Sequence, residues 1–152
     1  MPSILFVCSA NQCRSPMAHV LFEAFFVGKG VREEWRVESA GIWAYEGSRA
    51  TANAQKAMAE RGLDLTQHLS QPADSVLLKQ FDLTLVMEQR HKTVLQEQNP
   101  QLVDRIYLMR EIAGQEANFA DPVGGSLERY SAAADELEKI IEDSYERITG
   151  YA

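Results

Sequence analysis

The sequence predicts a single-domain α/β protein in which helices flank both faces of a parallel four-stranded sheet. Short apolar segments alternate along the chain with segments of helical periodicity, and strands that are separated by helices pair in parallel. The 152 residues are also enough for one domain, spanning 1–152, to bury its own core. In such sheets, ligands bind beyond the carboxyl ends of the strands.

The first strand and the first helix are expected close together. Four consecutive apolar residues predict a strand at residues 4–7, and apolar residues recurring on one side predict a helix at residues 16–26. Ser15 is suited to the N-cap of this helix, and Pro16 to its first position. A short loop therefore joins the carboxyl end of a strand to a helix N-terminus.

The middle of the chain continues the alternation. Residues 35–40 form the second expected strand, which ends at Gly41. A helix is expected at residues 52–61, with Gly62 as its stop signal. A short helix is predicted at residues 74–80.

The last part of the chain completes the sheet. Compact apolar runs predict strands at residues 83–87 and 106–108, separated by a polar helix at residues 89–98. A long irregular connection is expected from residue 109 to residue 125. The final helix is predicted at residues 127–148, where apolar side chains recur at helical spacing.

The composition excludes several functional classes. The formal net charge of −7 argues against general affinity for nucleic acid or anionic membranes. No apolar stretch reaches the roughly 18 residues of a membrane span. The two cysteines are too few for a disulfide framework, and no Cys/His set has metal-ligand spacing. Because the N-terminus also lacks a signal-peptide pattern, we expect a cytoplasmic protein. We further expect that it uses no metal or other cofactor.

The loop after the first strand contains the main candidate site. Cys8 and Arg14 bracket five residues, and the helix that follows turns its positive end toward them. This helix end, Arg14 and the Ser15 hydroxyl favour a thiolate at Cys8, and successive loop N–H groups can bind an anion. Arg14 can grip two phosphoryl oxygens at once. The alternatives are that Cys8 is only a small buried residue and that Arg14 only forms a surface ion pair. The position of the Cys8–Arg14 segment between a strand and a helix favours a phosphate site.

The segment Val7-Cys8-x3-Asn11-x-Cys13-Arg14-Ser15-Pro16-Met17-Ala18 resembles the low-molecular-weight protein tyrosine phosphatases, except that Ala10 stands where they usually have glycine. The resemblance covers nearly the whole chain, because further family motifs follow in order: Ser39-Ala40-Gly41, Val86-Met87 and Asp121-Pro122. It implies a phosphatase that acts on phosphorylated proteins.

The resemblance also implies a role for individual residues. Cys8 is expected to form a phosphocysteine intermediate, Arg14 to clamp the phosphate, and Asp121 to act first as general acid and then as general base. The remaining loop residues are expected to bind the phosphoryl group: Ser9, Ala10, Asn11, Gln12, Cys13 and Ser15.

A polar network that supports the loop is implied for Asn11, Ser39 and His68. Each assignment has a simpler alternative: Asn11 as a turn residue with positive φ, His68 as a surface histidine, and Asp121-Pro122 as the start of a turn. Cys13 matches the second loop cysteine of the family, so it is expected either to trap oxidised Cys8 as a disulfide or merely to pack the loop.

The substrate is less clearly indicated. Trp43, and with less support Tyr45, can form an aromatic wall, whereas Val123-Gly124-Gly125 gives a smaller wall than the aromatic residues found there in the best-known members. The sequence also resembles a bacterial subgroup that includes protein-arginine phosphatases, through features such as His91-Lys92. That subgroup has a threonine where Gln12 stands, so phosphotyrosine and phosphoarginine both remain possible substrates.

Two other functions fit the sequence less well. The related arsenate reductases relay electrons through later cysteines, and no cysteine follows Cys13. A phosphate-binding module without activity would not need Asp121. Glu88 stands where many tyrosine phosphatases have aspartate, which leaves its part in the network open. The sequence does not indicate an oligomeric state.

Overall fold

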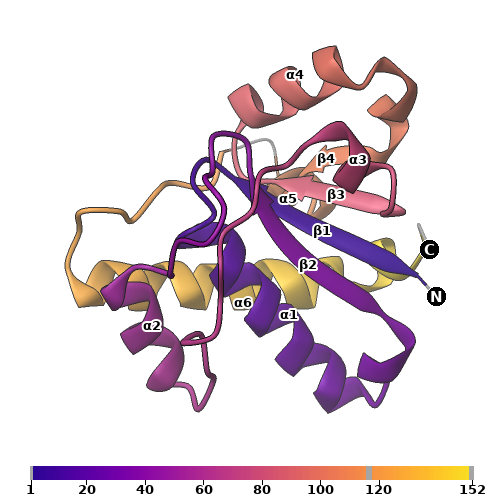
Figure 1. Ribbon diagram of the computed structural model, residues 1–152. Coiled ribbons are helices and arrows are strands. Elements are labelled where there is room, and N and C mark those ends of the chain that lie inside the picture. Colours follow the sequence, from indigo (N-terminus) through magenta and orange to yellow (C-terminus); the bar gives the residue numbers. More distant parts are fainter. Residues whose placement is uncertain (1, 116–117, 151–152) are drawn as a thin grey trace.

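The computed structural model describes residues 2–115 and 118–150 and contains a four-stranded parallel sheet with the order β2-β1-β3-β4 (Figure 1). The strands are β1 (Ser3–Cys8), β2 (Arg36–Gly41), β3 (Leu83–Val86) and β4 (Ile106–Leu108). β1 pairs with β2 on one side and with β3 on the other. The predicted fold class is confirmed.

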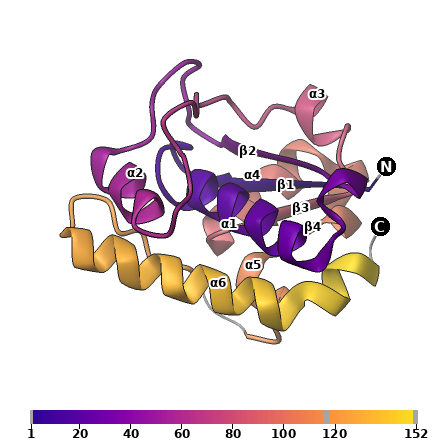
Figure 2. The same cartoon turned by 90° about the horizontal axis from the view of Figure 1, so that it is seen from below.

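Helices cover both faces of the sheet (Figures 1 and 2). One layer is built on the long helix α6 (Leu127–Gly150), which packs against α1 (Arg14–Lys29), α2 (Ala52–Ala59) and α5 (Met109–Ile112). The opposite layer contains α3 (Ser75–Leu78) and α4 (Gln89–Gln98). The described residues also include two short 3₁₀ helices, η1 (Arg32–Glu34) and η2 (Pro100–Arg105). Within residues 2–115 and 118–150, no helix combines the length and apolar character of a membrane span.

The side chains of β1 alternate between the two layers, as the two-residue period of a strand requires. Ile4 and Phe6 join the core beneath α1 and α6, whereas Leu5 and Val7 join the core beneath α3 and α4. All four are fully buried. Each contributes roughly 1.5–3 kcal/mol through removal of apolar surface from water, so the strand that ends at Cys8 is firmly fixed.

The predicted strands and helices agree with the structure, with shifts of one to a few residues at their ends. Three expectations were wrong. Ser15 is not an N-cap and Pro16 is not the first helical residue, because α1 already begins at Arg14. The Ser15 hydroxyl contacts Cys8 and Asn11 instead. The connection after residue 108 is not wholly irregular, since it starts with α5, where Glu111 accepts a hydrogen bond from the Leu108 N–H.

The strand order creates a natural binding crevice. From β1 the chain continues to β2 on one side, and later to β3 on the other side of β1. Helical connections therefore diverge at the carboxyl end of β1, which is the position where open α/β sheets bind ligands. Cys8 is the last residue of that strand.

Candidate active site

The rest of the protein uses the carbonyl groups and the N–H groups of residues 9–13 unequally. Hydrogen bonds from outside the loop reach the carbonyl groups of Cys8, Ser9, Asn11, Gln12 and Cys13. The donors are, in that order, Ile42 N (3.0 Å), Trp43 N (2.9 Å), His68 Nε2 (2.7 Å), Thr51 N (2.9 Å) and Met17 N (3.0 Å). In the part of the chain that the structure describes, the N–H groups of residues 9–13 donate to no protein acceptor. The loop thus offers a run of free backbone donors, which is suited to binding an anion.

Asn11 holds the loop in this shape. Its backbone has a φ of 57°, in the left-handed region that asparagine tolerates better than most residues. The buried side-chain amide donates to Ser15 Oγ (2.8 Å) and Ser39 Oγ (3.0 Å), and its oxygen accepts from the Gln71 N–H (3.0 Å). The structure therefore brings Asn11, Ser15 and Ser39 together in one hydrogen-bonded cluster.

Gly41 allows β2 to approach the loop. A Cβ at this position would lie 2.7 Å from the Ser9 carbonyl oxygen and 2.8 Å from the Asn11 nitrogen. Any side chain there would collide with the loop backbone, so the Ser-Ala-Gly motif has a steric explanation.

The Cys8 thiol is buried and lies 3.0 Å from Ser15 Oγ. Ser15 Oγ also lies 3.2 Å from the Ala40 carbonyl oxygen. Since Ser15 has one hydroxyl proton, it can turn from Ala40 to Cys8 and donate when Cys8 is a thiolate.

Arg14 is almost completely buried, at 1% exposure. Its Nη1 donates to Glu88 Oε2 (2.7 Å) and to the Phe119 carbonyl oxygen (2.8 Å), while Nη2 is more loosely placed, 3.5 Å from Asp121 Oδ2. The Nε atom is buried and has no hydrogen-bond partner among the described residues. A buried donor without an acceptor is costly, and an anion at the loop would satisfy it.

Glu88 and Arg90 follow β3 and were not predicted as site residues. Burial alone would raise the pKa of Glu88, but its hydrogen bonds with Arg90 and Arg14 outweigh burial and lower the pKa below its ordinary value. Arg90 contacts Ser9 Oγ (3.1 Å), and its guanidinium lies 5.2 Å from the centre of the Trp43 ring. One sequence signal could have identified Glu88 and Arg90: both come just after a strand, and ligands bind beyond the carboxyl ends of strands in such sheets.

His91 is a further residue that was not assigned to the site. It is fully buried, and its Nδ1 lies 3.2 Å from the Glu88 backbone nitrogen, while Nε2 lies 2.9 Å from Ser9 Oγ. Burial and, to a smaller extent, the charge of Arg14 lower the pKa of His91 from 6.5 to about 4. His91 is therefore neutral at pH 7.

Asp121 lies at the edge of the same loop. Its Oδ1 accepts from the Val123 N–H (3.0 Å) and from Cys13 Sγ (3.3 Å). Burial raises the pKa of the Cys13 thiol well above its usual range, and the nearby Cys8 and Asp121 add to this effect. Cys13 therefore remains a protonated donor to the carboxylate. Cys8 and Cys13 are both free thiols.

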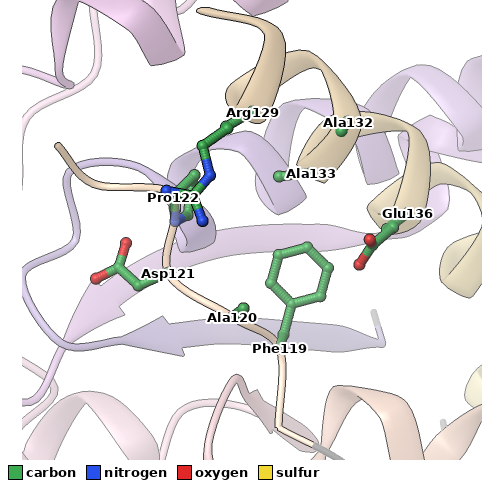
Figure 3. A pocket seen from close by; sticks show the side chains of 8 residues that line it. All are labelled: Phe119, Ala120, Asp121, Pro122, Arg129, Ala132, Ala133 and Glu136. Carbon is green, nitrogen blue, oxygen red and sulfur yellow. The ribbon is translucent and has the colours of Figure 1, made fainter. Parts of the chain in front are cut away.

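Phe119 fixes the segment that carries Asp121. Its N–H donates to the Met87 carbonyl oxygen (2.7 Å), and its own carbonyl oxygen accepts from Arg14. Figure 3 shows the Asp121 carboxylate pointing away from the Phe119 ring, which lines a pocket of about 200 Å³ between this segment and α6. Buried Phe119 thus aligns Asp121 with the loop at Cys8.

The other predicted residues lie around the loop. His68 is half-buried and donates to the Asn11 carbonyl oxygen, and burial lowers its pKa. Trp43 is half-exposed beside Arg90, whereas Tyr45 is 85% exposed. Gln12 is half-buried and Ala10 is exposed.

The family model described as "Low molecular weight phosphotyrosine protein phosphatase" matches residues 3–149. A protein-arginine-phosphatase from Geobacillus stearothermophilus is 36% identical over 146 residues, which cover 95% of each chain. The low molecular weight protein-tyrosine-phosphatase Wzb of Escherichia coli K12 is 34% identical and covers 90% of this chain and 88% of its own. Among solved structures, the arginine phosphatase YwlE, in a mutant form with a phosphorylated active-site serine, superposes with a TM-score of 0.91 at 32% identity, covering 97% of this chain and 95% of its own. The chain therefore belongs to the low molecular weight phosphotyrosine protein phosphatase family.

Proposed function

We propose that this phosphatase transfers the phosphoryl group of a phosphorylated protein side chain to Cys8 and then to water. One observation carries the proposal: the loop that follows the buried Cys8 offers the N–H groups of residues 9–13 and the Nε of Arg14, and none of these donors has a partner among the described residues. These donors match the three outer oxygens of a phosphoryl group. They stabilise the charge that those oxygens hold as the phosphorus becomes five-coordinate.

In the first step the Cys8 thiolate attacks phosphorus, the bond to the leaving oxygen breaks, and Asp121 donates its proton to that oxygen. In the second step Asp121 takes a proton from water, which attacks phosphorus and releases Cys8 and inorganic phosphate. The phosphorylated active-site serine of the related YwlE mutant supports a covalent intermediate of this kind. Arg14 can hold the phosphoryl group throughout, because its guanidinium is planar and always charged.

Phosphotyrosine is the proposed substrate. The half-exposed Trp43 ring offers a face against which a phenyl ring can pack. The Arg90 guanidinium lies over that ring and beside the loop, so it adds positive charge where a phenolate would leave. The same charge would repel the guanidinium of a phosphoarginine.

Phosphoarginine is the second candidate, because two relatives favour it. The enzymes from Bacillus subtilis and Geobacillus stearothermophilus that are 35% and 36% identical to this chain are both protein-arginine-phosphatases. Gln12 stands where the bacterial subgroup that includes protein-arginine phosphatases has threonine. Exchanging Gln12 for threonine therefore tests whether this position affects the choice between the two substrates.

The test combines trapping with a substrate comparison. Acid quenching during turnover, followed by mass spectrometry, should reveal a phosphoryl adduct on Cys8, and Cys8→Ser should abolish turnover of p-nitrophenyl phosphate. Matched peptides that carry phosphotyrosine or phosphoarginine should then differ in kcat/KM, with phosphotyrosine preferred. Full activity of Cys8→Ser would refute the mechanism, whereas preference for phosphoarginine would refute only the first choice of substrate.

A further inference from the structure

Three side-chain nitrogen atoms lie within hydrogen-bonding distance of the Ser9 hydroxyl oxygen. His91 Nε2 lies 2.9 Å from Ser9 Oγ, Arg90 Nη2 lies 3.1 Å from it, and Arg14 Nη2 lies 3.4 Å from it. Arginine nitrogens can only donate, so two of the three contacts place hydrogen atoms on the Ser9 oxygen. The direction of the third depends on the tautomer of His91.

The backbone fixes that tautomer. The Glu88 N–H points to His91 Nδ1 at 3.2 Å, and a backbone N–H is always a donor. Nδ1 must therefore be unprotonated, and the neutral ring carries its proton on Nε2. His91 consequently donates to Ser9 as well.

Ser9 Oγ has two lone pairs and one proton. Three donors more than fill the lone pairs, and none of the three can accept the proton. No hydrogen bond within residues 2–115 and 118–150 gives the Ser9 proton an acceptor. The hydroxyl proton is therefore free, beside the nitrogen of Arg14 that also lies 3.5 Å from Asp121.

We propose that Ser9 is a further substrate-binding residue, whose side-chain hydroxyl donates a hydrogen bond to a phosphoryl oxygen of the bound substrate. His91 and Arg90 are positioning residues, because they occupy the Ser9 lone pairs and so direct its proton into the site. This inference rests on the proposed phosphoryl transfer, and it assigns to Ser9 a side-chain contact in addition to that of its backbone N–H.

The experiment measures binding without turnover. Inorganic phosphate is titrated into the protein while the loop amides are followed by NMR, for the parent, Ser9→Ala and Ser9→Thr. Loss of a hydrogen bond to a charged oxygen should weaken phosphate binding by about ten-fold in Ser9→Ala. Ser9→Thr retains the hydroxyl and should bind within about two-fold of the parent. Ser75→Ala in α3, outside the site, is the matched control and should bind like the parent.

A double-mutant cycle tests the part played by His91. If His91 acts only by directing the Ser9 proton, His91→Phe should weaken phosphate binding in the parent but change it little in Ser9→Ala. Equal binding by the parent and Ser9→Ala would overturn the inference, and this result does not depend on whether the His91 variant folds. It would leave the phosphocysteine mechanism intact, because that mechanism is tested separately, by the adduct on Cys8 and by the activity of Cys8→Ser.

Discussion

Oε2 of Glu88 lies 2.7 Å from Nη1 of Arg14, so a carboxylate that follows β3 fixes the guanidinium at the start of α1. Arg14 is 1% exposed and Glu88 18% exposed, which makes this a largely buried ion pair. The pair orients the residue that is proposed to grip the phosphate. It also gives the buried cation a counter-charge when no substrate is present.

Glu88→Gln should therefore destabilise the protein. Removing one partner of a buried ion pair leaves the other uncompensated, which costs about 3–5 kcal/mol when burial is complete and less for the partly exposed Glu88. The free energy of unfolding should fall in urea titrations, and kcat/KM should fall with it because Arg14 loses its fixed orientation. Glu97→Gln on the exposed part of α4 is the control. Unchanged stability in Glu88→Gln would contradict the importance of the pair.

Gly41→Ala should distort the phosphate loop. The new Cβ would lie 2.7–2.9 Å from backbone atoms of residues 9–11, and the backbone must move to relieve the overlap. We expect a loss of about 1–3 kcal/mol in stability, together with a large loss of kcat/KM. Gly28→Ala in α1 is the matched control, since its Cβ meets nothing within 4 Å, and it should stabilise the helix by about 0.5–1 kcal/mol. Equal effects of the two changes would refute the steric argument.

Asp121→Asn should lower kcat by about 10²–10⁴-fold, the usual contribution of general acid–base catalysis. The affinity for inorganic phosphate should change much less, because the main donors to the anion are Arg14 and the loop N–H groups. Steady-state kinetics and phosphate titration measure the two effects separately. An Asp121→Asn variant with parental kcat across the pH range would exclude Asp121 from proton transfer.

His91 should make stability depend on acid pH. Its pKa is lowered in the folded state from 6.5 to about 4, so the unfolded chain binds a proton first as the pH falls. The contribution is fully present above pH 6.5 and is lost as the pH falls through about 4, by up to about 3 kcal/mol. The difference in unfolding free energy between the parent and His91→Gln, measured between pH 7 and pH 4, should change over this window. A constant difference would contradict the prediction.

Cys13→Ser should make peroxide damage harder to reverse. In the parent, oxidised Cys8 can form a disulfide with Cys13, which a thiol reductant reopens, whereas the variant has no second thiol and Cys8 proceeds to irreversible acids. Activity recovered after peroxide and then dithiothreitol should be high in the parent and low in Cys13→Ser. Serine keeps a donor for Asp121, so activity before oxidation should be largely retained. Equal recovery would leave Cys13 with a packing role only.

The arrangement of strands and helices could be predicted well from the sequence. The strand that ends at Cys8, the loop and the following helix are all set by neighbouring residues, since apolar runs and helical periodicity are local patterns. The same locality explains why Cys8 and Arg14 could be assigned together. Ser15 was wrongly predicted as an N-cap, because its hydroxyl is used by Cys8 and Asn11 rather than by the helix end.

Arg90 and Phe119 were found at the site only in the structure, and the contacts of Glu88 and His91 there could not be derived from the sequence. All four lie more than 70 residues from the loop in sequence, so no local pattern links them to it. The parallel pairing of β1 with β3 brings this second segment to the same sheet edge as Cys8. The tertiary structure then sets the charge and the partner of these side chains: burial keeps His91 neutral at pH 7, and Glu88 forms an ion pair with Arg14.

The sequence by itself determined the fold class and the reactive loop, because both depend on short-range patterns of apolar and chemically distinctive residues. Only the tertiary structure decided how that loop is supported and which way its polar groups point. The physical reason is that a hydrogen bond or an ion pair depends on distance and direction in space, and these arise when strands far apart in the chain are packed side by side.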